Sequence, residues 1–194
     1  MPISGNPTKI KAYVVKILAK GWLWYTFCMK EKLISLVVFS IAFAFVEATV
    51  VFYLREIFHY SDTYIQTEYK TILNLGVIAF ILPDVPILND TRINIAEIQR
   101  EGTTIIMLLV IAFLSGAKWR ERIGAFLIAF GVWDIFYYIF LKYLTGWPRT
   151  LFDIDVYFLI PVTWVGPVIT PIVISTVLII LGLKLYTPSS PRNH

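Results

Sequence analysis

Three carboxylates inside apolar stretches are the residues whose types and spacing could do chemistry. Glu47, Glu101 and Asp134 each interrupt a separate run of mostly apolar residues. An unpaired charge inside a membrane costs several kcal/mol, so an ionisable residue there indicates a functional site by default. Carboxylate oxygens favour hard ions such as calcium, magnesium and manganese over copper or zinc. The three residues therefore predict a site for a metal, another cation or a proton.

The positions of these carboxylates along their helices predict that all three lie at one level of a bundle. Glu47 comes seven residues before the end of its run, Glu101 eight after the start of its run, and Asp134 seven before the end of its run. Since a helix rises ~1.5 Å per residue, each lies about 10 to 12 Å below the same surface. We expect a pair of carboxyl carbons within about 8 Å, bridged by an arginine, a water, a proton or a metal.

A wider set of polar residues accompanies the three carboxylates. Glu97 and Glu101 are four residues apart on one helical face, and such like charges destabilise a helix unless a cation or a shared proton intervenes. The predicted network residues are Arg55, Glu56, Glu97, Arg100, Tyr138 and Asp155. Three interpretations stay open: a network that holds the helices together, a cation or proton site, and a contact with a partner protein.

The sequence assigns no reaction and no catalytic residue. It contains no G-x-S-x-G nucleophile motif, no phosphate-binding glycine loop and no H-E-x-x-H. Paired carboxylates could serve acid and base chemistry on a lipid or lipid-linked substrate, so an enzyme stays open.

Cysteine and histidine counts exclude several cofactors. A single cysteine, Cys28, allows neither an internal disulfide nor a cysteine-bound iron-sulfur cluster. The two histidines are His59, outside the apolar runs, and His194 at the end of the chain, so no haem is held between helices. A di-iron site in a helical bundle would need Glu-x-x-His motifs within the spans. No cofactor is predicted, apart from the hard cation named above.

The amino-acid composition indicates which class of protein contains these residues. Of the 194 residues, 58% are hydrophobic and 15% are charged, and the mean hydropathy is +0.73. A soluble domain carries about 25% charged residues. We expect an all-α, polytopic membrane protein, because runs of about 20 apolar residues are long enough to cross the hydrocarbon core. The predicted four transmembrane helices cover about 33–54, 93–114, 123–141 and 167–186.

The distribution of charge predicts the orientation, because cytoplasmic segments carry an excess of lysine and arginine. One side of the four-span arrangement holds only two of the 13 acidic residues, Glu31 and Glu121. The same side holds 11 of the 17 basic residues, namely Lys9, Lys11, Lys16, Lys20, Lys30, Lys32, Lys118, Arg120, Arg122, Lys184 and Arg192. This asymmetry predicts a multi-pass protein with both termini cytoplasmic, including a tail at 187–194.

Residues 1–32 form a basic N-terminal arm before the four-helix domain at 33–186. The lysines lie near one helical face, and Trp22, Trp24 and Tyr25 would sit at the level of the lipid headgroups. The pattern predicts an interfacial amphipathic helix that binds the lipid bilayer and its anionic headgroups, or that docks on another membrane subunit. Membrane-adjacent lysines point to lipid as the partner and to no nucleic acid.

Two apolar runs are too short to span a membrane. The run 72–82 ends at Pro83 and predicts an interfacial helix or a buried loop segment. The run 156–164, broken by Pro161, predicts a re-entrant or interfacial element. The fourth span is predicted to start at Pro167, as the first helical residue, with a bend at its outer end.

Several short motifs, taken together, point to a resemblance to a known group of proteins. With them the chain resembles, from about 33 to 182, a group of small uncharacterised bacterial four-helix inner-membrane proteins. The resemblance implies an inner-membrane location and this topology, and it implies no activity. The motifs are Val46-Glu47-Ala48, Tyr53-Leu54-Arg55-Glu56, Arg100-Glu101, Phe130-Gly131-Val132-Trp133-Asp134, Tyr137-Tyr138, Gly146-Trp147-Pro148, and Asp155 to Pro161 followed by Trp164, Gly166 and Pro167.

Two functions are compatible with these observations. The first is an accessory or scaffolding subunit of a larger membrane complex, favoured by the small size, the basic arm and the 16% aromatic content. The alternative is an outward-facing intramembrane carboxylate site that binds a cation, a proton, or a small or lipid substrate.

Overall fold

The computed structural model describes residues 7–58, 69–83 and 91–187, and in the first helix it describes the side chains of Phe27–Ile57. It contains four helices, α1 (Pro7–Phe58), α2 (Thr91–Ser115), α3 (Trp119–Thr145) and α4 (Ile169–Tyr186). Four short strands, β1 (Tyr69–Asn74), β2 (Ala79–Pro83), β3 (Ile154–Phe158) and β4 (Thr163–Pro167), form one small sheet. Of the tail predicted at 187–194, residues 188–194 lie outside the described residues.

The four predicted spans are confirmed as helices long and apolar enough to cross a membrane. They cover Phe27–Ile57, Thr91–Ser115, Trp119–Thr145 and Ile169–Tyr186. Within this bundle α3 is the central helix, because it contacts α1, α2 and α4. By contrast, α1 and α2 contact one another much less than either contacts α3. The central position of α3 places its side chains against every other helix.

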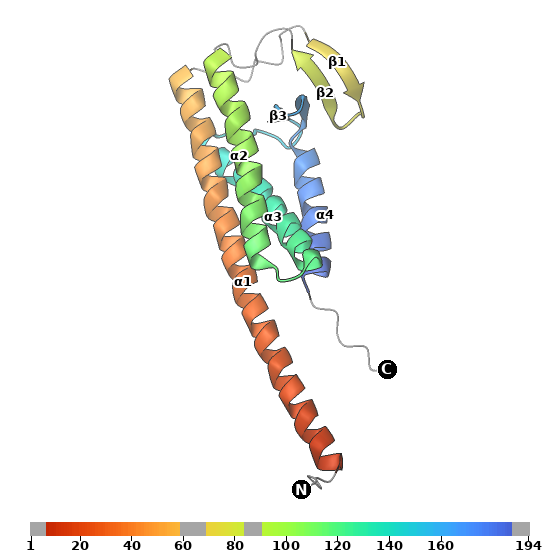
Figure 1. Cartoon of the computed structure of the whole chain (residues 1–194). Helices are drawn as coiled ribbons and strands as arrows, with labels where there is room; N and C mark the ends of the chain where they lie inside the picture. Colours follow the sequence, from red (N-terminus) through yellow and green to blue (C-terminus); the bar gives the residue numbers. More distant parts are fainter. Residues whose placement is uncertain (1–6, 59–68, 84–90, 188–194) are drawn as a thin grey trace.

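The first helix is longer than its predicted span. It is continuous over 52 residues, which at ~1.5 Å per residue is about 78 Å, and a bilayer core is about 30 Å thick. Figure 1 shows its N-terminal part extending well past the ends of the other helices. Residues 7–32, predicted as a separate arm, are thus the beginning of the same helix. Met29 is already buried in the bundle core. The interfacial position of the arm stays a prediction.

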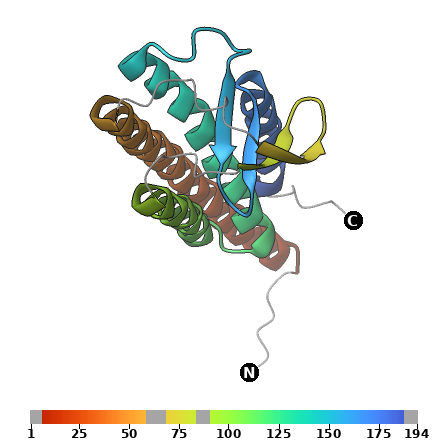
Figure 2. The ribbon, with the colours of Figure 1, turned by 90° about the horizontal axis from the view of Figure 1, so that it is seen from above.

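The sheet lies at the end of the bundle where α1 ends and α2 begins, here named the sheet end (Figure 1). Its strand order is β1-β2-β4-β3 and every neighbouring pair is antiparallel. Seen from that end, β3 and β4 lie over the end of the α3–α4 pair, and the β1–β2 hairpin extends outward (Figure 2). Open sheet edges are not tolerated in lipid hydrocarbon. We therefore place the sheet at the membrane surface or against protein.

These strands correct two predictions and the all-α fold class. The run 72–82 forms neither an interfacial helix nor a loop, but parts of β1 and β2 with the turn between them. The run 156–164 likewise contributes to β3 and β4. Both runs are short enough for two strands and a turn, and apolar periodicity alone does not separate such runs from helices. At the first turn Gly76 has φ 83°, a conformation that favours glycine, and its N–H is accepted by Asn74 Oδ1 at 2.8 Å.

The start of the fourth span is also corrected. Pro167 is the last residue of β4, where it pairs with Ile154, and α4 begins at Ile169. Pro171 is then the third residue of α4. The first four N–H groups of a helix have no intrahelical partner, so Pro171 removes no hydrogen bond and requires no bend.

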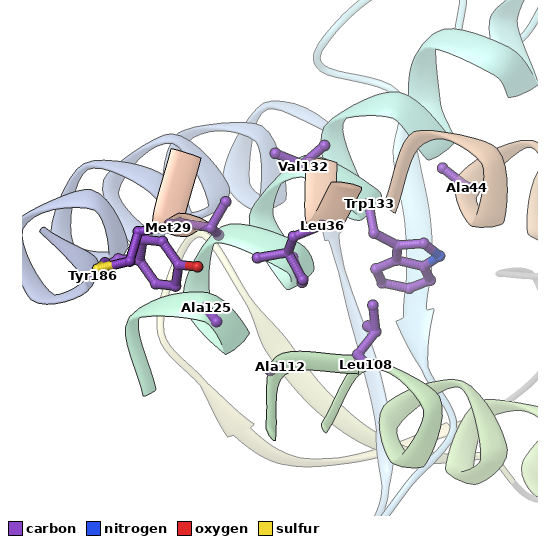
Figure 3. Packing of buried hydrophobic residues seen from close by; sticks show 11 residues of the cluster. Met29, Leu36, Ala44, Leu108, Ala112, Ala125, Val132, Trp133 and Tyr186 are labelled. Carbon is purple, nitrogen blue, oxygen red and sulfur yellow. The ribbon is translucent and has the colours of Figure 1, made fainter. Parts of the chain in front are cut away.

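The larger apolar cluster fills the half of the bundle away from the sheet, here named the closed half, and a smaller cluster of Ala48, Tyr138, Leu141, Trp147 and Val168 lies at the sheet end. Leu36, Ala112, Ala125 and Ile128 are at most 2% exposed and lie in one cluster. Figure 3 shows this cluster, with side chains from α1, α2, α3 and α4 converging on α3. The closed half therefore holds the helices together by close apolar packing.

Candidate functional site

A cavity of about 310 Å³ lies at the sheet end, among all four helices and the sheet. This volume is in the range of small-ligand sites. Its ionisable lining residues, tyrosines apart, are Glu47, Arg55, Glu97, Arg100, Glu101, Asp134 and Asp155. Its aromatic lining residues are Phe130, Trp133, Tyr137, Tyr138, Trp147, Tyr157, Phe158 and Trp164. The cavity thus combines an apolar wall with many polar groups, which is how ligand sites are built.

An arginine-centred cluster joins α1 to α2 on one wall of the cavity. Arg100 forms an ion pair through Nη1 with Glu47 and donates from Nε to Glu97 Oε2 at 2.8 Å. The Thr104 hydroxyl donates to the second Glu47 oxygen at 2.8 Å. Glu47 is only 5% exposed, so its charge is balanced by these two groups and not by water. Arg100 also supplies the positive charge that the like-charged pair Glu97 and Glu101 was expected to need.

The second predicted carboxylate ties α2 to the sheet. Glu101 Oε2 accepts the backbone N–H of Leu159 at 2.8 Å. Leu159 directly follows β3, in the turn that leads to β4. The contact therefore holds this turn over the cavity.

The third predicted carboxylate joins α3 to α4. Asp134, 8% exposed, accepts the Ser175 hydroxyl at Oδ2, at 2.7 Å. One turn further along α3, the Tyr138 hydroxyl donates to Asp155 Oδ2 at 2.7 Å. Since Asp155 lies in β3, this second bond connects α3 to the sheet.

The structure brings the three predicted carboxylates to one cavity, because Glu47, Glu101 and Asp134 all line it. Each has a different polar partner. Of the six predicted network residues, five also line the cavity, and Glu56 instead lies exposed at the end of α1. Within the described residues no three His, Cys, Asp or Glu side chains form a group that could hold a metal ion. A metal on the three carboxylates stays a prediction.

Two tryptophans that line the cavity have indole nitrogens that are covered by protein atoms, and neither nitrogen has a hydrogen-bond partner in the part of the chain that the structure describes. They are Nε1 of Trp133 and Nε1 of Trp164. Trp133 is 6% exposed. Figure 3 shows the Trp133 ring between Ala44 and Leu108. Its nitrogen is on the side nearer to the sheet end, the direction in which α1 runs from Leu36 to Ala44. A buried donor without an acceptor costs about 1–3 kcal/mol, so these two groups require an explanation.

A second arginine lies at the mouth of the same cavity. The guanidinium carbon of Arg55 is 4.5 Å from the centroid of the Trp147 ring, a cation–π distance. Trp147 in turn lies beside Tyr138, with 6.5 Å between ring centroids. The aromatic wall is therefore continuous from α3 into the segment after it.

The sheet contributes a phenol that keeps its proton. Tyr157, in β3, donates its hydroxyl to the carbonyl oxygen of Pro167 at 2.6 Å. Burial raises the pKa of Tyr157 to about 12. Gly166 is required beside it, because a Cβ there would lie 2.5 Å from the Val77 carbonyl oxygen and 2.6 Å from the Tyr157 hydroxyl. These contacts hold β4 close to both neighbouring strands.

Sequence reasoning missed several residues of the site. Ser175, Thr104 and the Leu159 backbone are the partners of the three predicted carboxylates. The two indole donors were missed as well. For Ser175 and Thr104 a signal existed, since each is a hydroxyl within an apolar helix. No sequence signal identifies an unpaired indole nitrogen, because only packing decides whether an acceptor is near.

Comparison with known proteins identified no relative. No family model matches the chain, and no curated protein and no solved structure matches it. The functional argument therefore depends on the geometry of the cavity.

Proposed function

We propose that this membrane protein binds a small ligand in the cavity at the sheet end, as an outward-facing intramembrane site. The observation that carries the proposal is the cavity of about 310 Å³, which all four helices and the sheet line with a mostly apolar wall and several charged groups. The surrounding carboxylates and arginines would orient such a ligand within an otherwise apolar wall.

Charge asymmetry supports the outward orientation of this cavity. The segments at the closed half carry Lys118, Arg120 and Arg122, and most lysines of the chain precede the first span. The positive-inside rule then places the closed half on the cytoplasmic side and the sheet end outside. The bacterial inner membrane is the location that the family resemblance implies, and it is part of this proposal.

Native mass spectrometry of the full-length protein, extracted in a gentle detergent, tests ligand binding. Ile174 lines the cavity, and a tryptophan there would fill it. Val173, the neighbouring residue, does not line the cavity and is 54% exposed, so Val173→Trp is a matched control. We expect the wild type and Val173→Trp to retain a small non-covalent ligand, and Ile174→Trp to lose it. The same added ligand mass on all three proteins, or no added mass on any of them, contradicts the proposal.

Thiol labelling in intact cells tests the orientation. Cys28 is exposed and must first be replaced, as Cys28→Ser. A cysteine at Leu75, exposed between β1 and β2, should react with an impermeant reagent from outside, and one at Ala117 should not. Labelling at Ala117 alone would reverse the orientation.

An accessory or scaffolding role in a larger membrane complex is the second candidate. It is supported by the N-terminal part of α1, which extends past the other helices and carries several lysines (Figure 1). Such an extension offers a surface for another membrane subunit or for anionic lipid. Native gel migration of the detergent extract tests it. A monomer of 22.3 kDa, alone, would contradict the role.

A hard cation on Glu47, Glu101 and Asp134 is the remaining candidate occupant. Oxygen-only ligands would select calcium, magnesium or manganese. Elemental analysis of purified protein tests it, with Glu101→Gln as the comparison. A stoichiometric metal that the variant loses would support this occupant over an organic ligand.

A further inference from the structure

We propose that the turn at 75–78, between β1 and β2, is a membrane anchor. It inserts apolar side chains at the boundary between the headgroups and the acyl chains, in the bilayer leaflet at the sheet end. The turn joins the two strands of the hairpin that extends outward from the bundle (Figure 2). This contact with lipid is separate from ligand binding in the cavity.

The side chains of the hairpin are apolar and exposed near the turn. Leu75 is 58% exposed and Val77 is 59% exposed. Ile72 and Leu73, in the strand just before the turn, are exposed as well. The only charged residue of the two strands and the turn is Lys70, near the opposite end of β1. Large apolar side chains gathered on one protruding element indicate contact with a membrane or with another protein.

The backbone of the turn has hydrogen-bond partners within the protein. The N–H of Leu75 donates to the carbonyl oxygen of Ile78 at 2.9 Å, and the N–H of Gly76 donates to Asn74 Oδ1 at 2.8 Å. Backbone groups that meet hydrocarbon must be satisfied by the protein, because no water is present there to replace the missing partner. These hydrogen bonds therefore suit the turn to contact with acyl chains.

The depth of the turn follows from its contact with α4. The hydroxyl of Thr170, the second residue of α4, donates to the carbonyl oxygen of Val77 at 3.2 Å. Thr170 and Lys184 are 14 residues apart, about 21 Å along the helix, whereas the hydrocarbon core is about 30 Å thick. Even if the Lys184 side chain extends to the headgroups, Thr170 lies no farther out than the opposite boundary of the core. The backbone of Val77 is therefore held at that boundary.

Continuity with the apolar surface of α4 favours lipid over a partner protein. Val173 and Val177, one and two helical turns after Thr170, are exposed on this span. In Figure 1 the turn is the part of the hairpin nearest to the level of α4, and the other ends of β1 and β2 lie farther out. Lys70 is four residues before the end of β1, about 13 Å along the strand, where its ammonium would meet anionic headgroups.

The strand edge of β1 is compatible with this placement. An open edge is excluded from hydrocarbon, but β1 runs outward from the turn into the headgroup layer, where water can bond its backbone. Only the turn and the nearest side chains then reach the acyl chains. Ile78, at the end of the turn, lines the cavity, so the anchor also positions part of the cavity wall.

Site-directed spin labelling of the full-length protein tests the depth, in nanodiscs of phosphatidylethanolamine and phosphatidylglycerol. Cys28→Ser provides the background, and single cysteines at Leu75 and Val77 carry the label. Lys70 is the control in the headgroup layer, and Val173 is the control in the acyl chains. Oxygen concentrates among acyl chains and a charged nickel chelate stays in water. We expect the ratio of oxygen to nickel collisions at 75 and 77 to exceed that at 70 several-fold and to approach that at 173.

The rate of thiol labelling gives a second measurement. The turn stays on one side of the membrane, so an impermeant reagent still reaches a cysteine at Leu75 from the same side as one at Lys70. We expect the reaction at Leu75 to be several-fold slower, because a thiol at the acyl boundary forms less of the reactive thiolate. In detergent-denatured protein the two rates should be equal, which controls for the sequence around each cysteine.

Each outcome of these measurements has a distinct meaning. A label at Leu75 and Val77 that collides mainly with the nickel chelate places the turn in water and overturns the inference, as do equal thiol rates in the membrane. Few collisions with either reagent mean that a second copy or another subunit covers the turn, and this also overturns it. If the turn contacts lipid while Ile174→Trp expels no ligand, this inference stands and the proposed function is wrong.

Discussion

The two ends of the α3–α4 pair differ in what accompanies the helix contact, although the close backbone approach continues as far as Gly131, where a Cβ would lie 2.6 Å from the Ser175 carbonyl oxygen. In the closed half, glycines bring the two backbones into contact: a Cβ at Gly124 would lie 2.7 Å from the Tyr186 nitrogen, and one at Gly182 would lie 2.8 Å from the Gly124 carbonyl oxygen. At the sheet end the same helices are joined by the Asp134 and Ser175 side chains, beside a cavity of about 310 Å³.

This difference assigns separate tasks to the two halves. Close contact of small residues supplies van der Waals packing, which drives helix association in lipid. At the sheet end, polar and aromatic residues surround a cavity, so the helices there pack less closely. Substitutions in each half should therefore affect stability and binding in different proportions.

The largest effect is expected from Arg100→Met. The change keeps much of the side-chain volume but leaves Glu47, 5% exposed, without its cation. Breaking a buried ion pair by removing one partner costs about 3–5 kcal/mol, and the partial exposure of Arg100 puts the expected loss near the lower limit. Reversible unfolding in mixed detergent measures it. The double variant Arg100→Met with Glu47→Gln should recover part of the loss, and no recovery would show that the pair is not the cause.

Gly182→Leu should have the next largest effect and should act on the closed half alone. The new side chain meets Gly124 and Ile128, so α3 and α4 must separate, at a cost of about 1–3 kcal/mol. The control is Leu183→Ala, at a 42% exposed position on the same helix. If Gly182→Leu leaves the unfolding free energy unchanged, the glycine contact does not hold the helices together.

Substitutions at Asp134 test the sheet end. Asp134→Asn keeps a hydrogen bond to Ser175 and should be milder than Asp134→Leu, which removes hydrogen bonding as well as charge. We expect about 1 kcal/mol less stability for Ser175→Ala, which leaves the Asp134 carboxylate without its donor. Ligand binding should fall more than stability does in Asp134→Asn. If Asp134→Asn lowers ligand binding and the free energy of unfolding by equal amounts, the sheet end has no separate role in binding.

The smallest effect is expected on the local stability of the turn at 149–153, which follows α3. The hydrogen bond from the Thr150 hydroxyl at 2.6 Å holds the pKa of Asp153 below its ordinary value. The lowered pKa means that the ionised form stabilises the turn above about pH 4, and that this contribution is lost as the pH falls through the pKa of the folded protein. Amide exchange at 149–153 should be faster in Asp153→Asn at neutral pH. At acidic pH the two proteins should converge; a constant difference would contradict the assignment.

Sequence periodicity predicted the helices far better than it predicted the elements between them. Each predicted span lies within or close to an observed helix, because some 20 apolar residues in a row leave few alternatives in a membrane. The runs at 72–82 and 156–164 were misread, since their pairing joins β2 to β4 across more than 80 residues. Local patterns do not contain such a partner.

The site, like the fold, was predicted only in part from the sequence. Depth along a helix predicted that Glu47, Glu101 and Asp134 would meet at one level, and all three line one cavity. Their partners did not follow from the sequence, since a serine, a threonine and a backbone N–H are common groups whose positions depend on how the elements pack.

The amino-acid sequence by itself determined four apolar helices and the level at which their carboxylates lie, because helical rise and bilayer thickness are fixed physical lengths. Only the tertiary structure decided that Arg100 also pairs with Glu47 on α1, and that the indole nitrogens of Trp133 and Trp164 are buried without a hydrogen-bond partner among the described residues. The rotation of each helix and the pairing of the strands set those contacts. Both depend on packing between segments that are distant in the chain.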